Sequence, residues 1–310
     1  MNTYLLKGRG RGDSRFPYMA WFRAAWENAG GCVRMDTRLP HKLRAALGHA
    51  GMAFTTGIRQ GRLLVCGGHR VESVAWPWCY FYEIVPVMWD VWPEYFDLLV
   101  KFVKKNKVKL VFCTSSQQVE HLKECVPGLK AVWLPEGIDV TSYPMGNRLA
   151  ERSVDLLEYG RRMDSVHDDL VGHPFRRSIN HVYQHGQDLL FPDFESMTAG
   201  IRNAKITICY PQCDTKPWRA GAVETLTQRY WEGMLSGTLV AGRAPKELID
   251  LCGYNPVITL GEHPARQIEN VLNHIEDYQE LVDRNRRYVE ENADWSKRIP
   301  IVMKALEENG

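Results

Sequence analysis

The fold expected for this chain rests on the stretch Glu224-Thr-Leu-Thr-Gln-Arg-Tyr-Trp-Glu-Gly-Met-Leu-Ser-Gly-Thr-Leu-Val-Ala-Gly242. Thr225, followed three residues later by a glutamine, is typical of a helix start, and Gly237 is typical of a helix end. Apolar residues recur between them at helical spacing, so Arg229 and Glu232 fall together on the opposite face. The residues after Gly237 predict a short buried strand. The sequence therefore predicts a helix, a glycine turn and a strand, which hold an arginine and a glutamate beside a loop.

This stretch resembles the nucleotide-binding unit of group-1, family 4-like glycosyltransferases of the GT-B fold. Members carry two glutamates separated by seven residues, as Glu224 and Glu232 are, and a run like Glu232-Gly-Met-Leu-Ser-Gly-Thr-Leu-Val follows the second. Arg229, three residues before Glu232, also resembles the Arg-x-x-Glu of the shorter, spore-maturation-type members.

The resemblance implies a nucleotide-sugar donor, with Glu232 on the ribose hydroxyls and Glu224 on the donor sugar. A carboxylate can accept both hydroxyls of a ribose, and a helix N-terminus with an arginine favours a diphosphate. The alternative interpretation is a surface Arg–Glu pair on an ordinary amphipathic helix.

Composition indicates two α/β domains, because 310 residues exceed one typical core. The net charge of +2 does not favour a nucleic-acid partner. No apolar run approaches a spanning helix, and the N-terminus lacks the core of a signal peptide. The eight cysteines are scattered, and no second pair joins Cys209 and Cys213 to complete a zinc site. We therefore expect a cytoplasmic protein whose membrane contact is at most peripheral.

The chain begins like a nucleotide-binding unit, with a strand at 3–7, a glycine-rich loop at 8–15 and a helix at 17–27. The loop glycines do not fit the dinucleotide fingerprint. We expect Gly10 and its neighbours to present backbone N–H groups and arginines to an anion; a flexible surface turn is the alternative.

A further strand is expected at 84–89, and Asp90 follows it, at the end where α/β sheets bind ligands. The turn resembles the His-Asp turn of family 4 members, but Trp89 replaces the histidine, so no catalytic histidine carries over. Asp90 remains a candidate catalytic residue on the acceptor side. The aromatic residues at 76–82 could form core, an acceptor platform or a membrane-facing patch.

A strand, helix and strand between 108 and 134 lead into Pro135-Glu-Gly-Ile-Asp139, which resembles the Pro-Asn-Gly-Val-Asp that joins the two GT-B domains. We therefore expect an acceptor-side domain at 1–143 and a donor-side domain at 144–310, both Rossmann-like and facing a cleft. Three helices are expected at the C-terminus. The resemblance implies that the last one crosses back onto the first domain.

The expected strand at 154–159 is followed by Gly160-Arg161, which resembles the phosphate-binding Gly-Arg of the family. The later lysine of that motif is missing, because Val166-His167 stand in its place, so other cations must contribute. Since no carboxylate cluster is arranged for a metal, we expect neither a metal nor a cofactor besides the donor. Surface charge is the alternative for Arg161. The other candidate phosphate ligands are Lys216, Arg219 and Arg229.

Together these motifs predict a retaining, metal-independent glycosyltransferase that acts on a glycan, a lipid-linked glycan or a small-molecule acceptor. Two alternatives stay open. The departures at Trp89 and after Gly160 are compatible with a non-catalytic relative that only binds a nucleotide. Asp36, at the end of a second strand, would suit a Rossmann-type oxidoreductase, although the failed glycine fingerprint counts against it.

Overall fold

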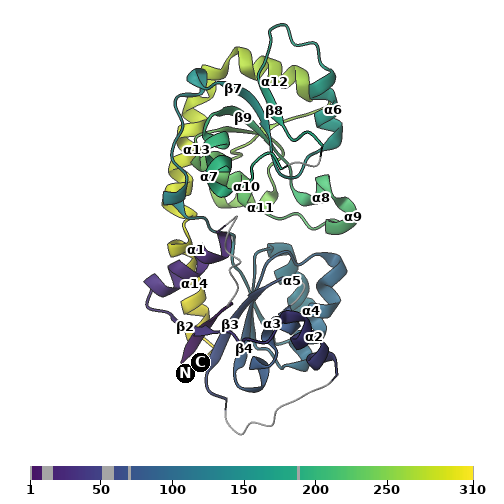
Figure 1. Cartoon of the computed structure of the whole chain (residues 1–310), viewed down its shortest axis with the longest axis vertical. Coiled ribbons are helices and arrows are strands. Elements are labelled where there is room, and N and C mark those ends of the chain that lie inside the picture. Colours follow the sequence, from purple (N-terminus) through teal and green to yellow (C-terminus); the bar gives the residue numbers. More distant parts are fainter. Residues whose placement is uncertain (1, 9–16, 51–58, 69–70, 187–188, 310) are drawn as a thin grey trace.

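The computed structural model describes residues 2–8, 17–50, 59–68, 71–186 and 189–309. These residues form two α/β domains that follow one another along the long axis of the molecule (Figure 1). The chain passes from the first sheet to the second between residues 134 and 153. In the described part, no helix is long and apolar enough to cross a membrane.

The first domain contains a six-stranded parallel sheet with the order β2-β1-β3-β4-β5-β6. Helices cover both of its faces, as a sheet buried on two sides requires. Its strands are β1 (Thr3–Lys7), β2 (Cys32–Met35), β3 (Arg62–Gly67), β4 (Glu83–Met88), β5 (Leu110–Cys113) and β6 (Lys130–Trp133). Its helices are α1 (Tyr18–Asn28), α2 (His41–His49), α3 (Val71–Ala75), α4 (Pro93–Lys105), α5 (Ser116–Cys125) and the short 3-10 helix η1 (Trp78–Tyr80).

The second domain contains a five-stranded parallel sheet with the order β11-β10-β9-β7-β8. Its strands are β7 (Val154–Glu158), β8 (His181–Tyr183), β9 (Ala204–Cys209), β10 (Leu239–Gly242) and β11 (Ile258–Thr259). Its helices are α6 (Asp164–Gly172), α7 (Phe194–Arg202), α8 (Gln212–Thr215), α9 (Pro217–Ala220), α10 (Gln228–Leu235), α11 (Lys246–Cys252), α12 (Pro264–Asn273), α13 (Gln279–Asn292) and α14 (Trp295–Glu307). Short 3-10 helices are η2 (Val140–Ser142), η3 (Leu149–Glu151) and η4 (Ile275–Tyr278).

Both sheets share one topology, in which the first strand of the domain lies between the second and the third. The chain therefore reverses its direction of winding between β1 and β3, and again between β7 and β9. In open α/β sheets such a reversal opens a crevice at the carboxyl ends of the strands, where ligands bind. This confirms the predicted class of fold, two doubly wound parallel-sheet domains.

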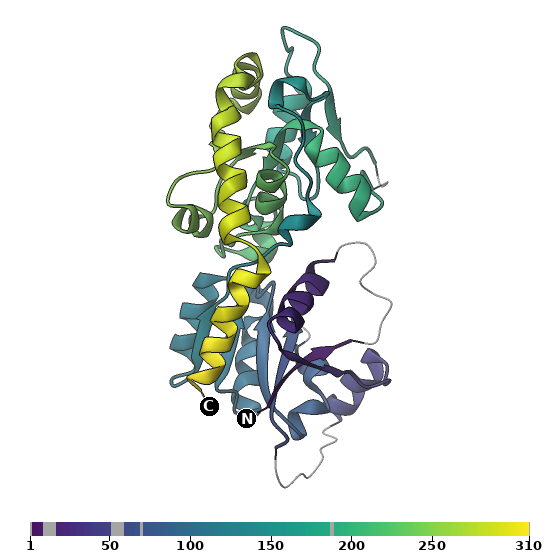
Figure 2. The ribbon, with the colours of Figure 1, turned by 90° about the vertical axis from the view of Figure 1, so that its left-hand side faces the viewer.

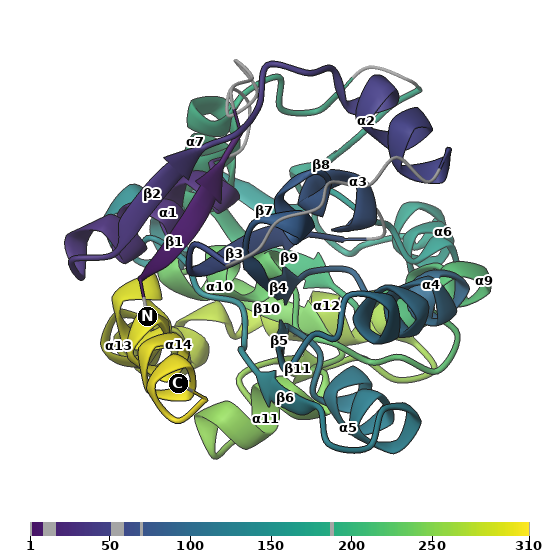
Figure 3. The ribbon, with the colours of Figure 1, turned by 90° about the horizontal axis from the view of Figure 1, so that it is seen from below.

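The C-terminal helices join the two domains. Helix α13 packs against α10 in the second domain, and α14 continues onto α1 of the first. Figure 2 shows α14 running along the first domain, and Figure 3 shows α13 and α14 on one side of the molecule. Trp295, at the start of α14, is buried edge-to-face against Phe22, with ring centroids 5.1 Å apart. The crossing that the family resemblance implied is therefore present.

The aromatic stretch at 76–82 contributes mainly to the core of the first domain. Trp76 and Tyr82 are buried, and the residues between them are half-buried. Tyr82 stacks edge-to-face on Tyr4 of β1, with ring centroids 6.1 Å apart. The core interpretation of this stretch therefore fits its two best-buried rings.

Candidate active site

A cavity of about 910 Å³ lies between the two domains. The first domain contributes the turn after β4 and the segment after β6, and the second contributes the segment after β7 and the start of α10. The cavity is thus at the carboxyl ends of strands from both sheets, where the topology places a ligand site. Seven of the charged or glycine residues that line it are Asp90, Glu136, Gly160, Arg161, Lys216, Arg229 and Glu232.

Gly160 and Arg161 follow β7 directly, and the backbone of Gly160 is left-handed, with φ of 72°. A Cβ atom at this position would approach Cδ of Arg229 to 3.0 Å, so a glycine suits the turn for two reasons. Nε and Nη2 of Arg161 are buried and have no hydrogen-bond partner among the described residues. Burial, and then the neighbouring Arg229, lower the pKa of the Arg161 guanidinium. An anion in the cavity would supply the missing partner.

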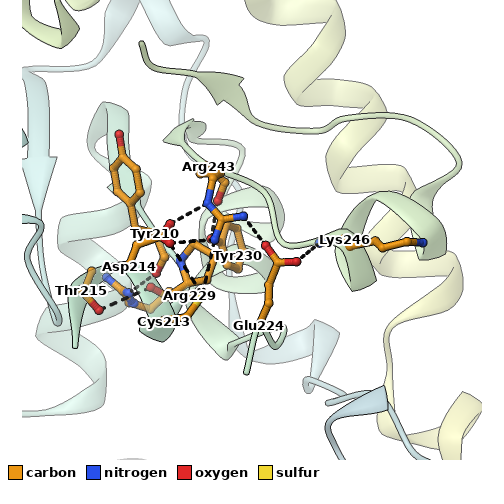
Figure 4. A network of polar contacts seen from close by, with 10 residues as sticks. Tyr210, Cys213, Asp214, Thr215, Glu224, Arg229, Tyr230, Arg243 and Lys246 are labelled. Atoms are coloured by element: carbon orange, nitrogen blue, oxygen red, sulfur yellow. Dashed lines mark hydrogen bonds and ion pairs between the residues drawn. The ribbon is translucent and has the colours of Figure 1, made fainter. Parts of the chain in front are cut away.

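Arg229 holds the loops after β7 and β9 together. Its Nη1 donates to the carbonyl oxygens of Tyr159 and Arg161, at 3.2 and 2.8 Å. Its Nη2 donates to the carbonyl oxygen of Tyr210 at 3.1 Å, and Figure 4 shows these two residues. Its Nε is buried and has no partner among the described residues. The guanidinium therefore adds positive charge beside Arg161, and its Nε is a buried donor that could meet a ligand.

Glu232 is 1% exposed and accepts hydrogen bonds from three tyrosine hydroxyls. Tyr18 and Tyr143 donate to Oε1, at 2.6 and 3.3 Å, and Tyr159 donates to Oε2 at 2.8 Å. Burial raises the pKa of Glu232, although the tyrosine hydrogen bonds oppose that rise. The alternative of a solvated surface Arg–Glu pair is wrong, because Arg229 is buried as well. Oε1 is therefore occupied by Tyr18, which belongs to the other domain, and by Tyr143.

Glu224 does not line the cavity that the described residues form. Its carboxylate pairs with Arg243 Nη1 and accepts from the backbone N–H of Lys246 at 3.2 Å. Figure 4 shows Arg243 between Glu224 and Asp214, whose two oxygens accept from the same guanidinium at 2.6 and 2.8 Å. Glu224 therefore binds the segment that follows β10.

The predicted helix start at Thr225 is wrong. Helix α10 begins at Gln228, after Thr227 in an extended conformation. The hydroxyl of Thr225 donates instead to Glu247 Oε2 at 3.2 Å, and the N–H of Leu226 donates to the same oxygen at 2.8 Å. A buried carboxylate of α11 thus holds this segment extended, which a local capping pattern cannot reveal.

The two cations of the expected donor loop lie differently. Lys216 lines the cavity between the short helices α8 and α9. Arg219 does not line it. Its guanidinium carbon lies 5.9 Å from the centroid of the Trp92 ring. Trp218, which the sequence did not single out, lines the cavity mouth and is 80% exposed. Gly10 lies outside the described residues.

Asp90 lines the cavity from the first domain and is exposed. Its backbone is left-handed, with φ of 52°, which a turn residue of its short polar type tolerates. Trp89, in the position of the family histidine, packs against Phe22 and Trp295, with ring centroids 5.7 and 6.1 Å apart. A core aromatic ring has therefore replaced any imidazole at this point of the turn.

Glu136 is a further cavity residue that the sequence did not single out. Its Oε2 is buried and has no hydrogen-bond partner among the described residues. Burial and then nearby Asp90 raise the pKa of Glu136 to about 8, while Arg161 opposes the rise. The available signal was the glutamate of Pro135-Glu-Gly, where the family resemblance has an asparagine.

A second unforeseen cluster supports the end of β7. Glu158 accepts hydrogen bonds from His167 Nδ1 and His181 Nε2, each at 2.8 Å. Burial alone would raise the pKa of Glu158, but the two histidine hydrogen bonds lower it overall. Glu158 therefore remains an anion that holds the strand in place two residues before Gly160. His167, which stands in the place of the family lysine, thus contacts Glu158 and supports the end of β7.

Metal-ligating side chains do not gather in groups of three or more within the described ranges. Asp36, on which an oxidoreductase would depend, is buried and accepts hydrogen bonds from Arg44 and Trp78, the nearest at 2.8 Å each. Its carboxylate is thus engaged inside the first domain and does not line the interdomain cavity.

No protein-family model and no curated protein matches the sequence. The structure, however, is similar to HepE of Anabaena solved with UDP and glucose, with a TM-score of 0.63 and 10% identity over 99% of this chain and 100% of that one. It is also similar to sucrose-phosphate synthase of Thermosynechococcus elongatus, with a TM-score of 0.60 and 13% identity over the whole of both chains. A putative UDP-N-acetylglucosamine 2-epimerase of Listeria monocytogenes has a TM-score of 0.54 and 10% identity over 100% of this chain and 97% of that one.

At these identities the likeness shows the fold. The fold is GT-B: two Rossmann-like domains face a cleft, and the last helices return to the first domain. The proteins of this fold named above include a sucrose-phosphate synthase and a putative epimerase, so the activity has to be argued from the cavity itself.

Proposed function

We propose that the protein transfers a sugar from a nucleoside-diphosphate-sugar donor to an acceptor hydroxyl. The observation that carries this proposal is that two buried donors of Arg161, Nε and Nη2, have no partner in the part of the chain that the structure describes, beside Gly160 in the interdomain cavity. A buried guanidinium without a partner costs free energy, and a diphosphate would meet both donors. HepE, which shares the fold, was solved with UDP and with UDP-glucose.

The charges of the cavity suit the departure of a diphosphate. Negative charge grows on the phosphate oxygen as the glycosidic bond breaks, and fixed cations stabilise that transition state more than the ground state. We assign this role to Arg161, with Lys216 and Nε of Arg229 as further positive groups. Retention of the anomeric configuration is proposed from the family resemblance, and the acceptor is proposed to be a glycan, a lipid-linked glycan or a small molecule.

Two further assignments follow from the proposal and require a rearrangement on donor binding. Glu232 binds the ribose hydroxyls once Tyr18 releases Oε1. Glu224 contacts the donor sugar once its ion pair with Arg243 opens. The present engagement of Glu224 favours one competing function, a protein that binds a nucleotide without transferring a sugar.

Nucleotide preference tests the proposal directly. UDP, GDP, ADP and NADH would each be added in a thermal-shift assay, because a ligand at 100 times its Kd stabilises the folded state by about 2.7 kcal/mol. We expect at least one nucleoside diphosphate to raise Tm and NADH to have no effect. Release of that nucleotide from the matching nucleotide sugar separates a transferase from a binding protein. Stabilisation by NADH alone would reject the proposal.

Chelation of divalent metals should leave activity intact. The phosphate-facing groups that we assign are guanidinium and ammonium groups, which neutralise a diphosphate without an ion. The measurement is nucleotide release with EDTA and with added Mg²⁺ or Mn²⁺, and rates within about twofold are expected. A strict requirement for either ion would show that the arginines do not suffice.

A further inference from the structure

Glu136 stands where the two domains meet, and its backbone is held from the second domain. Its carbonyl oxygen accepts from Trp231 Nε1 at 3.0 Å, and the carbonyl oxygen of Gly137 accepts from Gln228 Nε2 at 2.7 Å. Both donors lie on α10. The segment is therefore fixed, and the Glu136 carboxyl lines the cavity with a buried Oε2 that has no partner within the described residues.

Four charged groups from four different segments act electrostatically on this carboxyl. Asp90 follows β4, Arg161 follows β7, Glu232 lies on α10 and Glu247 on α11. Glu232 is engaged by its tyrosines, and Glu247 by Ser116, Thr225 and the N–H of Leu226. Three acidic neighbours and one cation, together with burial, therefore favour the protonated form of Glu136, and its pKa of about 8 lies near neutrality.

Resting on the proposed function, we propose that Glu136 is the catalytic residue that takes the proton of the acceptor hydroxyl. In its ionised form the carboxylate removes that proton while the acceptor oxygen forms its bond to the anomeric carbon. The bond from the anomeric carbon to the β-phosphate oxygen breaks, and its electron pair leaves on the nucleoside diphosphate. The proton then returns from Glu136 to water.

Two observations favour Glu136 over Asp90 for this step. Asp90 is exposed, whereas Glu136 has a buried carboxyl oxygen, Oε2, and its pKa of about 8 lies near the working pH, as suits an efficient general base. Glu136 also lines the same cavity as Arg161, the group assigned to the leaving diphosphate. A base on the leaving-group side of the sugar suits an acceptor that attacks from the face where the diphosphate leaves, which is the geometry of retention.

The first test uses UDP and needs no turnover. Calorimetry at pH 8.5 in buffers of different ionisation enthalpy measures the protons taken up on binding. UDP beside Glu136 should raise its pKa, so wild type takes up a fraction of a proton and Glu136→Gln takes up none. Glu120→Gln is the matched control, because Glu120 is an exposed carboxyl paired with Lys123 on α5. UDP binding with equal proton uptake in wild type and Glu136→Gln overturns this inference alone; failure of every nucleoside diphosphate to bind overturns the proposed function with it.

The second test needs no ligand. The pKa of the Glu136 carboxyl rises from 4.5 in the unfolded chain to about 8 in the folded protein. Between these pH values only the folded state holds the proton, so the free energy of unfolding falls as pH rises. Glutamine at this position does not titrate. The Tm of Glu136→Gln relative to wild type should therefore increase steadily from pH 5 to pH 8 and level off above it. A constant difference would show that Glu136 ionises normally and would overturn the assignment.

The third test uses turnover of UDP-glucose with water as acceptor. Glu136→Gln should lower kcat by about 10²- to 10⁴-fold, the usual contribution of a general base, with the Kd for UDP changed less than about threefold. In wild type, kcat/KM should rise with pH to a plateau above pH 8. Asp90→Asn should move that rise to lower pH, because it removes a negative neighbour. Loss of the pH dependence in Asp90→Asn, with its retention in Glu136→Gln, would assign the proton to Asp90 instead.

Discussion

Replacing Glu232 with alanine is expected to lower the free energy of unfolding by about 3–5 kcal/mol. The carboxylate is the common acceptor for the hydroxyls of Tyr18, Tyr143 and Tyr159, and truncation leaves three donors without it. It also removes side-chain volume next to α10, a helix whose residues from 229 to 235 are all buried. Urea denaturation of wild type and variant measures the difference.

Two milder variants separate the contributions. Tyr18→Phe removes a single hydrogen bond and should cost about 1 kcal/mol. Glu232→Gln keeps the volume and one acceptor oxygen, so it should stay folded and serve for nucleotide binding, where we expect a loss of about 1.5–3 kcal/mol for a charged hydrogen bond. A loss of stability below about 1 kcal/mol in Glu232→Ala would mean that the tyrosines find other partners. Unchanged nucleotide affinity in Glu232→Gln would remove Glu232 from the ribose site.

Replacing Arg161 with alanine is expected to weaken binding of the nucleoside diphosphate by about 10- to 150-fold, which corresponds to one charge-assisted hydrogen bond of about 1.5–3 kcal/mol. The same change should leave the unliganded protein as stable as wild type, or more stable, because it removes a cation with two buried donors that no described residue accepts from. Isothermal titration and urea denaturation measure the two effects separately.

The matched control is Arg177→Ala. Arg177 does not line the cavity that the described residues form, its side chain is 45% exposed and its Nη2 pairs with Asp155 at 3.3 Å, so affinity should change less than about threefold. A loss of stability in Arg161→Ala as large as its loss of affinity would make Arg161 a structural residue. Equal effects of the two substitutions on affinity would point to general charge attraction.

The two doubly wound domains could be predicted because their signals are local. Buried strands, helical periodicity and glycine turns each occupy a few adjacent residues, and the unit from α10 to β10 was recognisable on these grounds. Gly160 and Arg161 were found in the same way, since they follow a strand end directly. The cavity indeed contains both.

The partners of the site residues could not be predicted. Tyr18 lies 214 residues from Glu232 along the chain, and Glu247 reaches Ser116 across 131 residues. Such contacts arise only when two domains meet, and no spacing in the sequence encodes them. Arg243, which takes up Glu224, is likewise set by the packing of β10 against the loop after β9 rather than by the glutamate motif.

The double crossing between the domains fixes how the cleft can open. The two connecting segments lie side by side: the N–H of Ile138 donates to Ala293 at 3.0 Å, and the N–H of Trp295 donates to Ile138 at 3.2 Å. We expect the two adjacent connecting segments to act as a hinge, so that the domains rotate about one axis through it and do not twist freely. Away from the hinge, the two domains also meet where α9 contacts α4, with the guanidinium of Arg219 over the ring of Trp92. A rotation about Ile138 would therefore separate α9 from α4 and carry Trp218, which belongs to α9, away from the first domain.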